Sequence, residues 1–169
     1  MKQRTQRTEF SKILVAIDGS ETSMRAAEYA ISLSKRQNQQ EKQEEGIASE
    51  LIGLAVIDLT KLPNSFLAMA SGYYGAAELE EKRKEAQQWL DKVRTLAEEQ
   101  NYDIGKLKSA IIEDISSRVG HAIVNYAEST SIDLIVVGTR GRTGLKKMLL
   151  GSVASDVITY AHCHVLVVR

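Results

Sequence analysis

The stretch Asp133-Leu-Ile-Val-Val-Gly138-Thr-Arg-Gly141, followed after nine residues by Gly151-Ser152, is the part of the sequence that decides the fold. It begins with an apolar run of strand length, which is typical of a strand buried on both faces of a sheet. The glycines that follow let the backbone turn tightly, and the glycine-hydroxyl pair is typical of a helix start. The stretch therefore predicts a strand, a glycine-rich turn and a helix over 151–160.

Units of the same kind precede this stretch, and one more strand follows it. Apolar runs of strand length lie at 12–17, 51–57, 106–112, 133–137 and 165–168. Helical spacing of apolar residues follows Asp18 and recurs at 76–99, 115–128 and 151–160. An alternation of strands and helices is typical of a parallel sheet with helices on both of its faces. We therefore predict an α/β fold with a five-stranded parallel sheet.

Two orders of the five strands, numbered along the chain, are compatible with this alternation. Ligands of open α/β sheets bind at the carboxyl ends of the strands, where the strand order reverses. In the order 3-2-1-4-5 the reversal lies between the first and fourth strands, which end at Asp18 and Gly138. In the flavodoxin-like order 2-1-3-4-5, Glu113 and Asp114 would flank the site and the glycines would lie away from it. The glycines favour the order 3-2-1-4-5.

Length and composition predict one globular domain over 11–169, preceded by a flexible segment over 1–10. The chain has 169 residues and a hydrophobic content of 43%, which is enough to bury a sizeable core. We expect the polar tract 37–45 to be an exposed helix end or a loop, and 58–75, which holds the one proline, to be a loop. Trp89 lies among apolar residues at helical spacing, so we expect it in the core.

Charge and hydropathy exclude several functional classes. Lysine plus arginine and aspartate plus glutamate both total 22, so no net positive charge attracts nucleic acid or a membrane surface. The apolar runs are too short to span a membrane, and no signal-peptide core follows the basic residues near the start. The single cysteine, Cys163, fits a reducing compartment. We expect a cytoplasmic protein that binds neither nucleic acid nor membrane.

Backbone N–H groups at the glycine turn and at the helix start are suited to hold an anion. Gly138 and Gly141 let the chain pass close to a ribose or a phosphate, while Gly151 and Ser152 offer N–H groups and a hydroxyl. Basic residues gather in the same segment: Arg140, Arg142, Lys146 and Lys147. These features predict a ligand that bears phosphate.

Asp18 and Val56 lie at the ends of the first two predicted strands and complete the candidate site. The carboxylate of Asp18 can accept a hydrogen bond from a ribose hydroxyl or a base amino group, and the main chain of Val56 can pair with a base edge. Purely structural roles stay open as well. Asp18 with Glu21 has the spacing of a helix capping box, Ser152 can cap its own helix without a ligand, and the glycines can be plain turn residues.

The glycine and serine spacing, Gly-x2-Gly-x9-Gly-Ser, resembles the signature of the ATP-binding branch of the universal stress protein family. The resemblance covers 11–169 and includes Asp18 after the first strand and the Val-Ile-Asp sequence that ends at Asp58. The chain departs from the family at His164, where proline is common, and at Glu113-Asp114-Ile115, which lacks the common Gly-Asp-Pro turn.

The resemblance implies a sheet of order 3-2-1-4-5 and a homodimer that forms through the last strand, Val165 to Val168. It implies ATP, with Mg²⁺, as the ligand, and a regulatory switch in the stress response as the function. It implies that the ligand contacts Asp18, Val56, Gly138, Gly141, Gly151, Ser152 and Val153. The positive charge of Arg140 in the same segment adds this residue to the predicted site.

Two other functions are compatible with the same residues. A slow ATPase or phosphotransfer enzyme would use the same site, although the chain has no Walker A motif and only Asp18 and Asp58 are placed to help bind Mg²⁺. A ligand-free adaptor would use the dimer edge and the 58–75 loop as partner surfaces. His162 and His164 would share one face of a strand, but two ligands without a third make a weak metal site, so we predict none.

Overall fold

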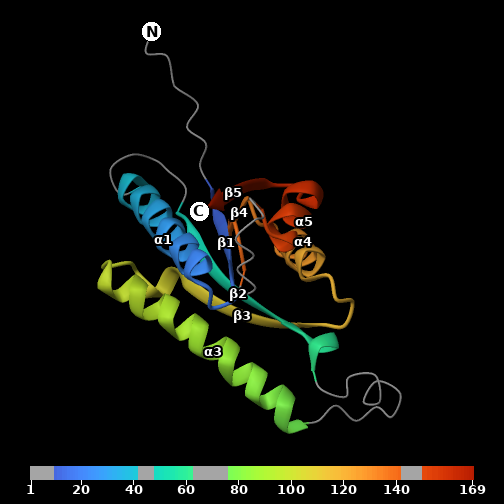
Figure 1. Ribbon diagram of the computed structural model, residues 1–169. Helices are drawn as coiled ribbons and strands as arrows, with labels where there is room; N and C mark the ends of the chain where they lie inside the picture. The colour runs from blue at the N-terminus through green and yellow to red at the C-terminus, as the bar shows by residue number, and fades with distance from the viewer. Residues whose placement is uncertain (1–9, 42–47, 63–75, 142–149) are drawn as a thin grey trace.

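The computed structural model describes residues 10–41, 48–62, 76–141 and 150–169, which form a sheet covered by helices (Figure 1). The strands are β1 (Lys12–Ile17), β2 (Glu50–Asp58), β3 (Leu107–Asp114), β4 (Leu134–Gly138) and β5 (His164–Val168). The α-helices are α1 (Glu21–Glu41), α3 (Ala76–Glu99), α4 (Val119–Ser129) and α5 (Ser152–Tyr160). Two short 3-10 helices are η1 (Leu59–Lys61) and η2 (Ile104–Lys106).

All five strands are parallel, and their order in the sheet is β3-β2-β1-β4-β5. This confirms the order 3-2-1-4-5 and excludes the flavodoxin-like alternative. The central strand β1 pairs with β2 on one side and with β4 on the other, so that Ile13 lies opposite both Leu51 and Leu134. The order reverses between β1 and β4, so the sequence placed the reversal correctly.

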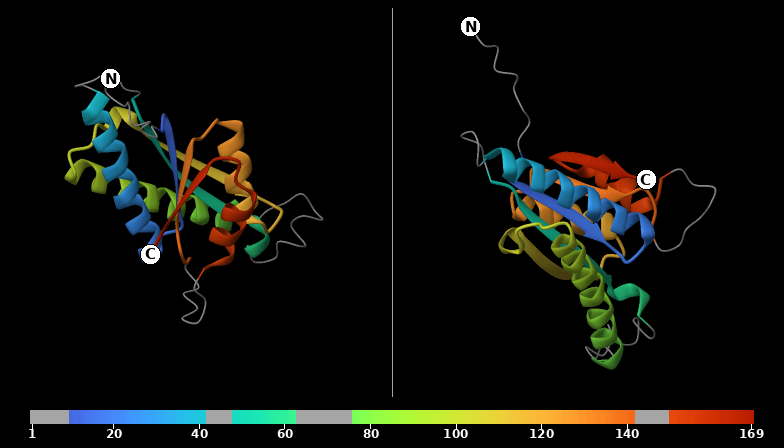
Figure 2. Two further views of the ribbon diagram at one scale, coloured as in Figure 1. Left: turned by 90° about the horizontal axis from the view of Figure 1, so that it is seen from above. Right: turned by 90° about the vertical axis from the view of Figure 1, so that its left-hand side faces the viewer.

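Helices cover both faces of the sheet, as the alternation of elements predicted (Figure 2). Alternate residues of the central strands point to opposite faces. Ile13 and Val15 of β1 pack with apolar residues of α1 and α3, whereas Leu14 packs with apolar residues of α4 and α5. The central strands β1 and β4 therefore have no polar face, which explains why their sequences are unbroken apolar runs.

The segment after β3 differs from the prediction, because α4 begins at Val119 and not at Ile115. The carboxylate of Asp114 accepts hydrogen bonds from the backbone N–H groups of Ser116 and Arg118, at 3.2 and 3.1 Å. Ser117 follows with a left-handed backbone, φ 60°. A local turn of this kind competes with helix formation, which delays the start of the helix.

Several predicted segments lie outside the described residues in whole or in part. They are 1–9 of the expected flexible terminus, 42–47 of the polar tract, 63–75 of the expected loop and 142–149 of the glycine segment. The first part of the polar tract is helical, since α1 extends to Glu41. None of the helices in the described ranges combines the length and the apolar character that crossing a membrane requires.

At the amino ends of the strands, Asp133 ties β4 to β1. Its carboxylate accepts hydrogen bonds from the Ser11 hydroxyl at 2.6 Å and from the Lys12 backbone N–H at 2.9 Å. Partial burial alone would raise the pKa of the Asp133 carboxyl, but these hydrogen bonds outweigh burial and hold the pKa below its ordinary value of 3.8. The ionised form is therefore the one that holds the two strands together.

We expect Asp133→Asn to lower the free energy of unfolding by about 1–2 kcal/mol at pH 7, because the hydrogen bonds to a charged acceptor are lost. A depressed pKa stabilises the fold fully above the unfolded-state pKa, and the stabilisation disappears as the pH falls through the folded-state pKa. The difference between the two proteins should therefore shrink below pH 3.8. Urea unfolding at several pH values measures it. Asp91→Asn, at an exposed position, is the control, and an equal loss there would contradict the assignment.

Candidate functional site

The candidate site lies where β1 and β4 end side by side. Asp18 directly follows β1, and Gly138 is the last residue of β4. β1 and β4 are neighbours in the sheet, so their carboxyl ends reach the same edge. The first turn of α1 starts at this edge, three residues after Asp18. The start of α5 lies there as well, because the Gly151 N–H donates a hydrogen bond to the carbonyl oxygen of Thr139.

The carboxylate of Asp18 shapes the turn between β1 and α1. Its Oδ1 accepts hydrogen bonds from the backbone N–H of Ser20 at 3.0 Å and from the Ser20 hydroxyl at 2.6 Å. The Ser20 Oγ in turn accepts from the backbone N–H of Ser23 at 3.2 Å, so Ser20 caps α1. The capping box predicted for Asp18 and Glu21 is therefore wrong. Glu21 instead pairs with Arg25 on the exposed side of the helix.

Gly138 has a packing reason to be glycine. A Cβ built on Gly138 would lie 2.8 Å from the carbonyl carbon of Thr22 and 3.0 Å from the backbone nitrogen of Ser23. Real Cβ atoms do not approach backbone atoms this closely, so the first turn of α1 packs directly on the end of β4. The packing of α1 on β4 is therefore sufficient to require this glycine, and this differs from the role of a plain turn residue that the sequence had left open.

Gly141 lies beside Asp18. A Cβ on Gly141 would lie 2.8 Å from the Oδ2 atom of Asp18, the oxygen that Ser20 does not bind. The turn after β4 thus passes over the turn after β1. These two residues come from positions far apart in the sequence, and the structure brings them together as the site prediction required.

Among the residues that the structure describes, no side chain caps the amino end of α5. Gly151 is the N-cap residue, and its N–H donates to the carbonyl oxygen of Thr139 at 2.7 Å. Ser152 is the first residue of the helix and is exposed, so the alternative role of Ser152 as N-cap is wrong. The first backbone N–H groups of an α-helix have no partner inside the helix, and the helix dipole favours negative charge near them. Ser152 and Val153 supply such groups here.

Arg140 and Val56 complete the set of predicted site residues. The Arg140 carbonyl oxygen accepts a hydrogen bond from the Thr22 hydroxyl at 2.5 Å. The side chain of Arg140 is partly buried. The register pairing of β1 with β2 ends at Ile17 and Ala55, so Val56 begins the part of β2 that extends past β1. Val56 is therefore one strand away from the glycine turn. The other predicted basic residues, Arg142, Lys146 and Lys147, lie outside the described residues.

Sequence reasoning missed a turn that recurs at three strand ends. Asp18, Asp58 and Asp114 each accept a hydrogen bond from the N–H and the hydroxyl of the serine or threonine two residues later. The pattern Asp-x-Ser/Thr after an apolar run was the signal that could have found it. A hydrogen bond of 3.0 Å between the Ser117 and Thr60 hydroxyls joins the turns after β2 and β3.

Asp58 is a poor candidate for holding Mg²⁺. Its Oδ1 binds Thr60, and its Oδ2 lies 3.0 Å from the ammonium of Lys61. Burial alone would raise the pKa of the Asp58 carboxyl, but the hydrogen bonds from Thr60 and Lys61 and the charge of Lys61 lower it overall. Both oxygens therefore already have partners. Within the described ranges, no group of three or more His, Cys, Asp or Glu residues is arranged to hold a metal ion.

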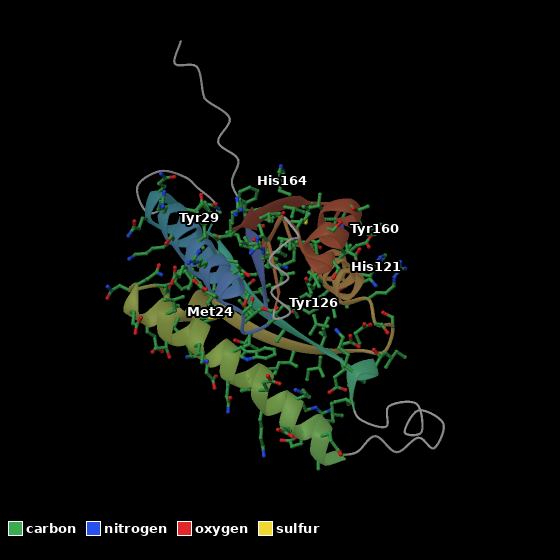
Figure 3. All side chains as sticks on the ribbon, in the orientation of Figure 1. Met24, Tyr29, His121, Tyr126, Tyr160 and His164 are labelled. Carbon is green, nitrogen blue, oxygen red and sulfur yellow. The ribbon has the colours of Figure 1, made fainter. Side chains whose placement is uncertain are left out.

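His164, Cys163 and Trp89 make contacts that belong to the packing of the fold. His164 makes an edge-on ring contact with Phe10, at 5.4 Å between ring centroids, and Figure 3 shows it on β5. His162 precedes the strand, so the predicted shared strand face is wrong. Partial burial raises the pKa of the Cys163 thiol above its ordinary value. Trp89 is partly buried and packs against the core formed with α1 and α3.

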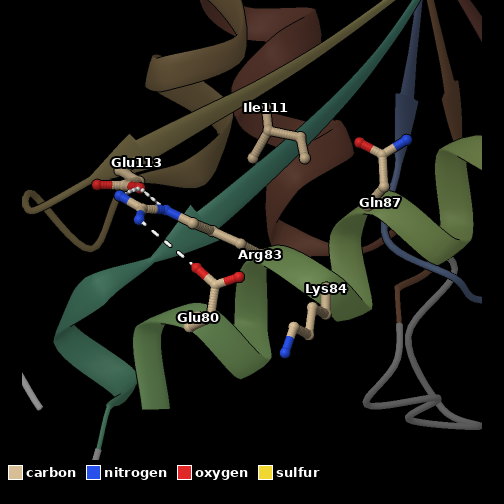
Figure 4. A pocket seen from close by; sticks show the side chains of 6 residues that line it. All are labelled: Glu80, Arg83, Lys84, Gln87, Ile111 and Glu113. Atoms are coloured by element: carbon tan, nitrogen blue, oxygen red, sulfur yellow. Dashed lines mark hydrogen bonds and ion pairs between the residues drawn. The ribbon is translucent and has the colours of Figure 1, made fainter. Parts of the chain in front are cut away.

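A pocket of about 330 Å³ lies between α3 and β3, at the β3 edge of the sheet (Figure 4). It is lined by side chains of α3 and β3, namely Glu80, Arg83, Lys84, Gln87, Ile111 and Glu113. Arg83 forms an ion pair with Glu113 at 2.6 Å. Its arginine pairs with Glu113, and the two carboxylates of Glu80 and Glu113 balance the charges of Arg83 and Lys84, so the pocket has no excess of positive charge for an anion.

Comparisons with known proteins agree with this architecture. The profile of the universal stress protein family matches residues 9–169. The chain is 36% identical to universal stress protein MJ0531 of Methanocaldococcus jannaschii over 95% of this chain and 82% of that protein. It superposes on the structure of universal stress protein UspA from Lactobacillus plantarum with a TM-score of 0.69, at 26% identity, over 96% of this chain and 100% of that one.

A more distant structure of the same fold contains a ligand. It is a universal stress protein in complex with cAMP, with a TM-score of 0.62 and 20% identity. The match covers 96% of this chain and 98% of that one. At this identity the likeness establishes the fold that the two chains share.

We expect Gly138→Ala to lower the free energy of unfolding by about 1–3 kcal/mol, because the added Cβ forces the first turn of α1 away from β4. Urea unfolding measures the loss. Gly105→Ala is the matched control, since its Cβ would lie 3.2 Å from a movable side-chain oxygen of Asp103, and its effect should stay within about 0.5 kcal/mol. Equal stability of the Gly138 variant and the wild type would refute the packing argument.

Proposed function

Because the chain belongs to the universal stress protein family, we propose that it binds an adenine nucleotide, ATP in particular, where β1 and β4 end. The nucleotide would act as the signal of a regulatory switch in the stress response. The observation that carries the proposal is the amino end of α5 beside the glycine turn, where the N-cap residue is a glycine and no side chain of the described residues caps the first N–H groups. The cAMP complex of a protein with this fold supports the choice of an adenine nucleotide.

The predicted site residues divide into those that would hold phosphate and those that would hold the nucleoside. The N–H groups of Gly141, Ser152 and Val153 and the side chain of Arg140 suit phosphate oxygens, because they are donors or carry positive charge. Gly138 and Gly151 shape the main chain around these donors.

Asp18 and Val56 would contact the nucleoside. The carboxylate of Asp18 adjoins Gly141, so a ribose hydroxyl placed there can donate to it. Val56 lies next to the end of β1 on the side away from the glycine turn, where its main chain can meet the base. Mg²⁺ bound with a polyphosphate would neutralise part of its charge, and Asp18 is the carboxylate that borders this turn.

Replacement of Ser152 by proline tests the proposal, because it removes a single backbone N–H group from the start of α5. Proline is favoured at the first position of a helix, and Gly151, with φ −75° and ψ 160°, has the backbone that a residue before proline adopts. Ser152→Pro should therefore preserve α5 and weaken ATP binding about tenfold, because one charge-assisted hydrogen bond is lost. Adenosine binding should not change. Isothermal titration calorimetry with ATP, ADP, AMP and adenosine measures both.

Ser152→Ala is the matched control, since it keeps the N–H group and removes the hydroxyl. It should weaken ATP binding by a few-fold at most. An equal loss of ATP affinity in the two variants would show that the Ser152 hydroxyl, and not the N–H group, binds the phosphate. Absence of binding by the wild type would refute nucleotide binding and favour the adaptor. Steady phosphate release in the same samples would favour the slow ATPase.

We also propose that two copies associate through β5. This strand is the last of the sheet, it pairs with β4 on one side, and the side chains of Val165 to Val168 are all partly exposed. An edge strand with apolar side chains offers unpaired backbone groups to a second copy, and a two-fold axis would satisfy both edges at once.

His164 and Val168 direct their backbone groups to β4, so the backbone groups of Val167 point to the free edge. Val167→Pro should therefore abolish the dimer, because proline removes a donor on this edge and leaves the pairing with β4 in place. Val167→Ala keeps the donor and should leave the dimer largely intact. Sedimentation velocity measures the mass, and circular dichroism checks that each variant is folded. A folded proline variant that remains dimeric, or a monomeric wild type, would contradict the proposed interface.

A further inference from the structure

Thr22 connects the first turn of α1 to the glycine turn. It is the second residue of α1, and its hydroxyl lies 2.5 Å from the carbonyl oxygen of Arg140, which is 118 positions further along the chain. The same turn of α1 packs on Gly138, so helix and glycine turn are in contact at two points. Neither the predicted site nor the family comparison gives Thr22 a role.

The hydrogen bond to Thr22 also fixes the direction of the next N–H group. The chain has no cis peptide bond among its described residues, and in a trans peptide the carbonyl and the following N–H point in opposite directions. Since the Arg140 carbonyl points to Thr22, the Gly141 N–H points away from α1. The Gly141 nitrogen lies 3.9 Å from the position of a Cβ on Gly151, which places it beside the start of α5.

The Gly141 N–H is therefore presented next to the donors of α5. Within the described part of the chain, the Gly141 N–H donates no hydrogen bond. If the Arg140–Gly141 peptide rotated, the carbonyl oxygen would take its place and would repel an anion. The Thr22 hydroxyl is the group that opposes this rotation, because it binds the carbonyl on the opposite side.

We infer that Thr22 is a positioning residue for phosphate binding. Its hydroxyl selects the orientation of the Arg140–Gly141 peptide in which the Gly141 N–H is available as a donor. The inference rests on the proposed nucleotide binding. It adds a residue of α1 to a site otherwise built from strand ends and α5. It also predicts that the contribution of Thr22 depends on phosphate and not on the nucleoside.

Thr22→Val removes the hydroxyl with little change in volume, and Thr22→Ser retains a hydroxyl at the same position. The valine variant should bind ATP about fivefold more weakly and adenosine as the wild type does, because one hydrogen bond that orients the site is lost. The serine variant should bind both like the wild type. Thr95→Val is the remote control, since the Thr95 hydroxyl bonds to a carbonyl of its own helix. Calorimetric titration gives the affinities.

A second readout needs no nucleotide. In the free protein, the carbonyl ¹³C resonance of Arg140 and the ¹⁵N resonance of Gly141 should shift in the valine variant and stay in place in the serine variant. Unchanged resonances, or equal weakening of ATP and adenosine binding, would overturn the inference. Wild-type affinity for ATP in the valine variant would overturn it and leave the proposed function intact. A wild type that binds no adenine nucleotide would overturn both.

Discussion

The close approach of β4 to the first turn of α1 is the constraint on which the rest of the structure depends. At Gly138 a helix backbone and a strand backbone meet without room for a Cβ atom. This contact places the amino end of α1 over the end of β4 and brings the turns after β1 and β4 together. Because protein interiors are close-packed, adding even one methyl group at this contact would displace both turns. The candidate site is therefore a consequence of packing.

Most of the fold could be predicted because its signals are local. An unbroken apolar run such as Lys12–Ile17 identifies a strand buried on both faces, and the sequence alone placed the helix 76–99 where the structure has it. The strand order was predicted from one argument, that the informative residues Asp18 and Gly138 should meet at the reversal. Patterns with periods of 2 or 3.6 residues do not depend on distant contacts.

The features that could not be predicted depend on contacts between distant positions or on competition within a turn. The hydrogen bond from Thr22 to Arg140 joins two segments that have no common pattern in the sequence. The capping of α1 by Ser20 was missed because Asp18 has the better-known spacing, yet its carboxylate is used to bind Ser20 itself. The late start of α4 has the same cause, because Asp114 holds the chain in a turn.

The use of these carboxylates within the chain determines what the sheet edge can bind. Three aspartates at the ends of adjacent strands suggest a cation site, but one oxygen of each is hydrogen-bonded to its own turn. The second oxygen of Asp58 pairs with Lys61, and that of Asp114 accepts from Arg118. The first backbone N–H groups of α5 differ from these turns, because they have no partner inside their own helix and the helix dipole adds to their effect. The carboxylates of this edge serve to form its turns, whereas the start of α5 supplies donors, and this division of roles is the basis of the proposed anion site.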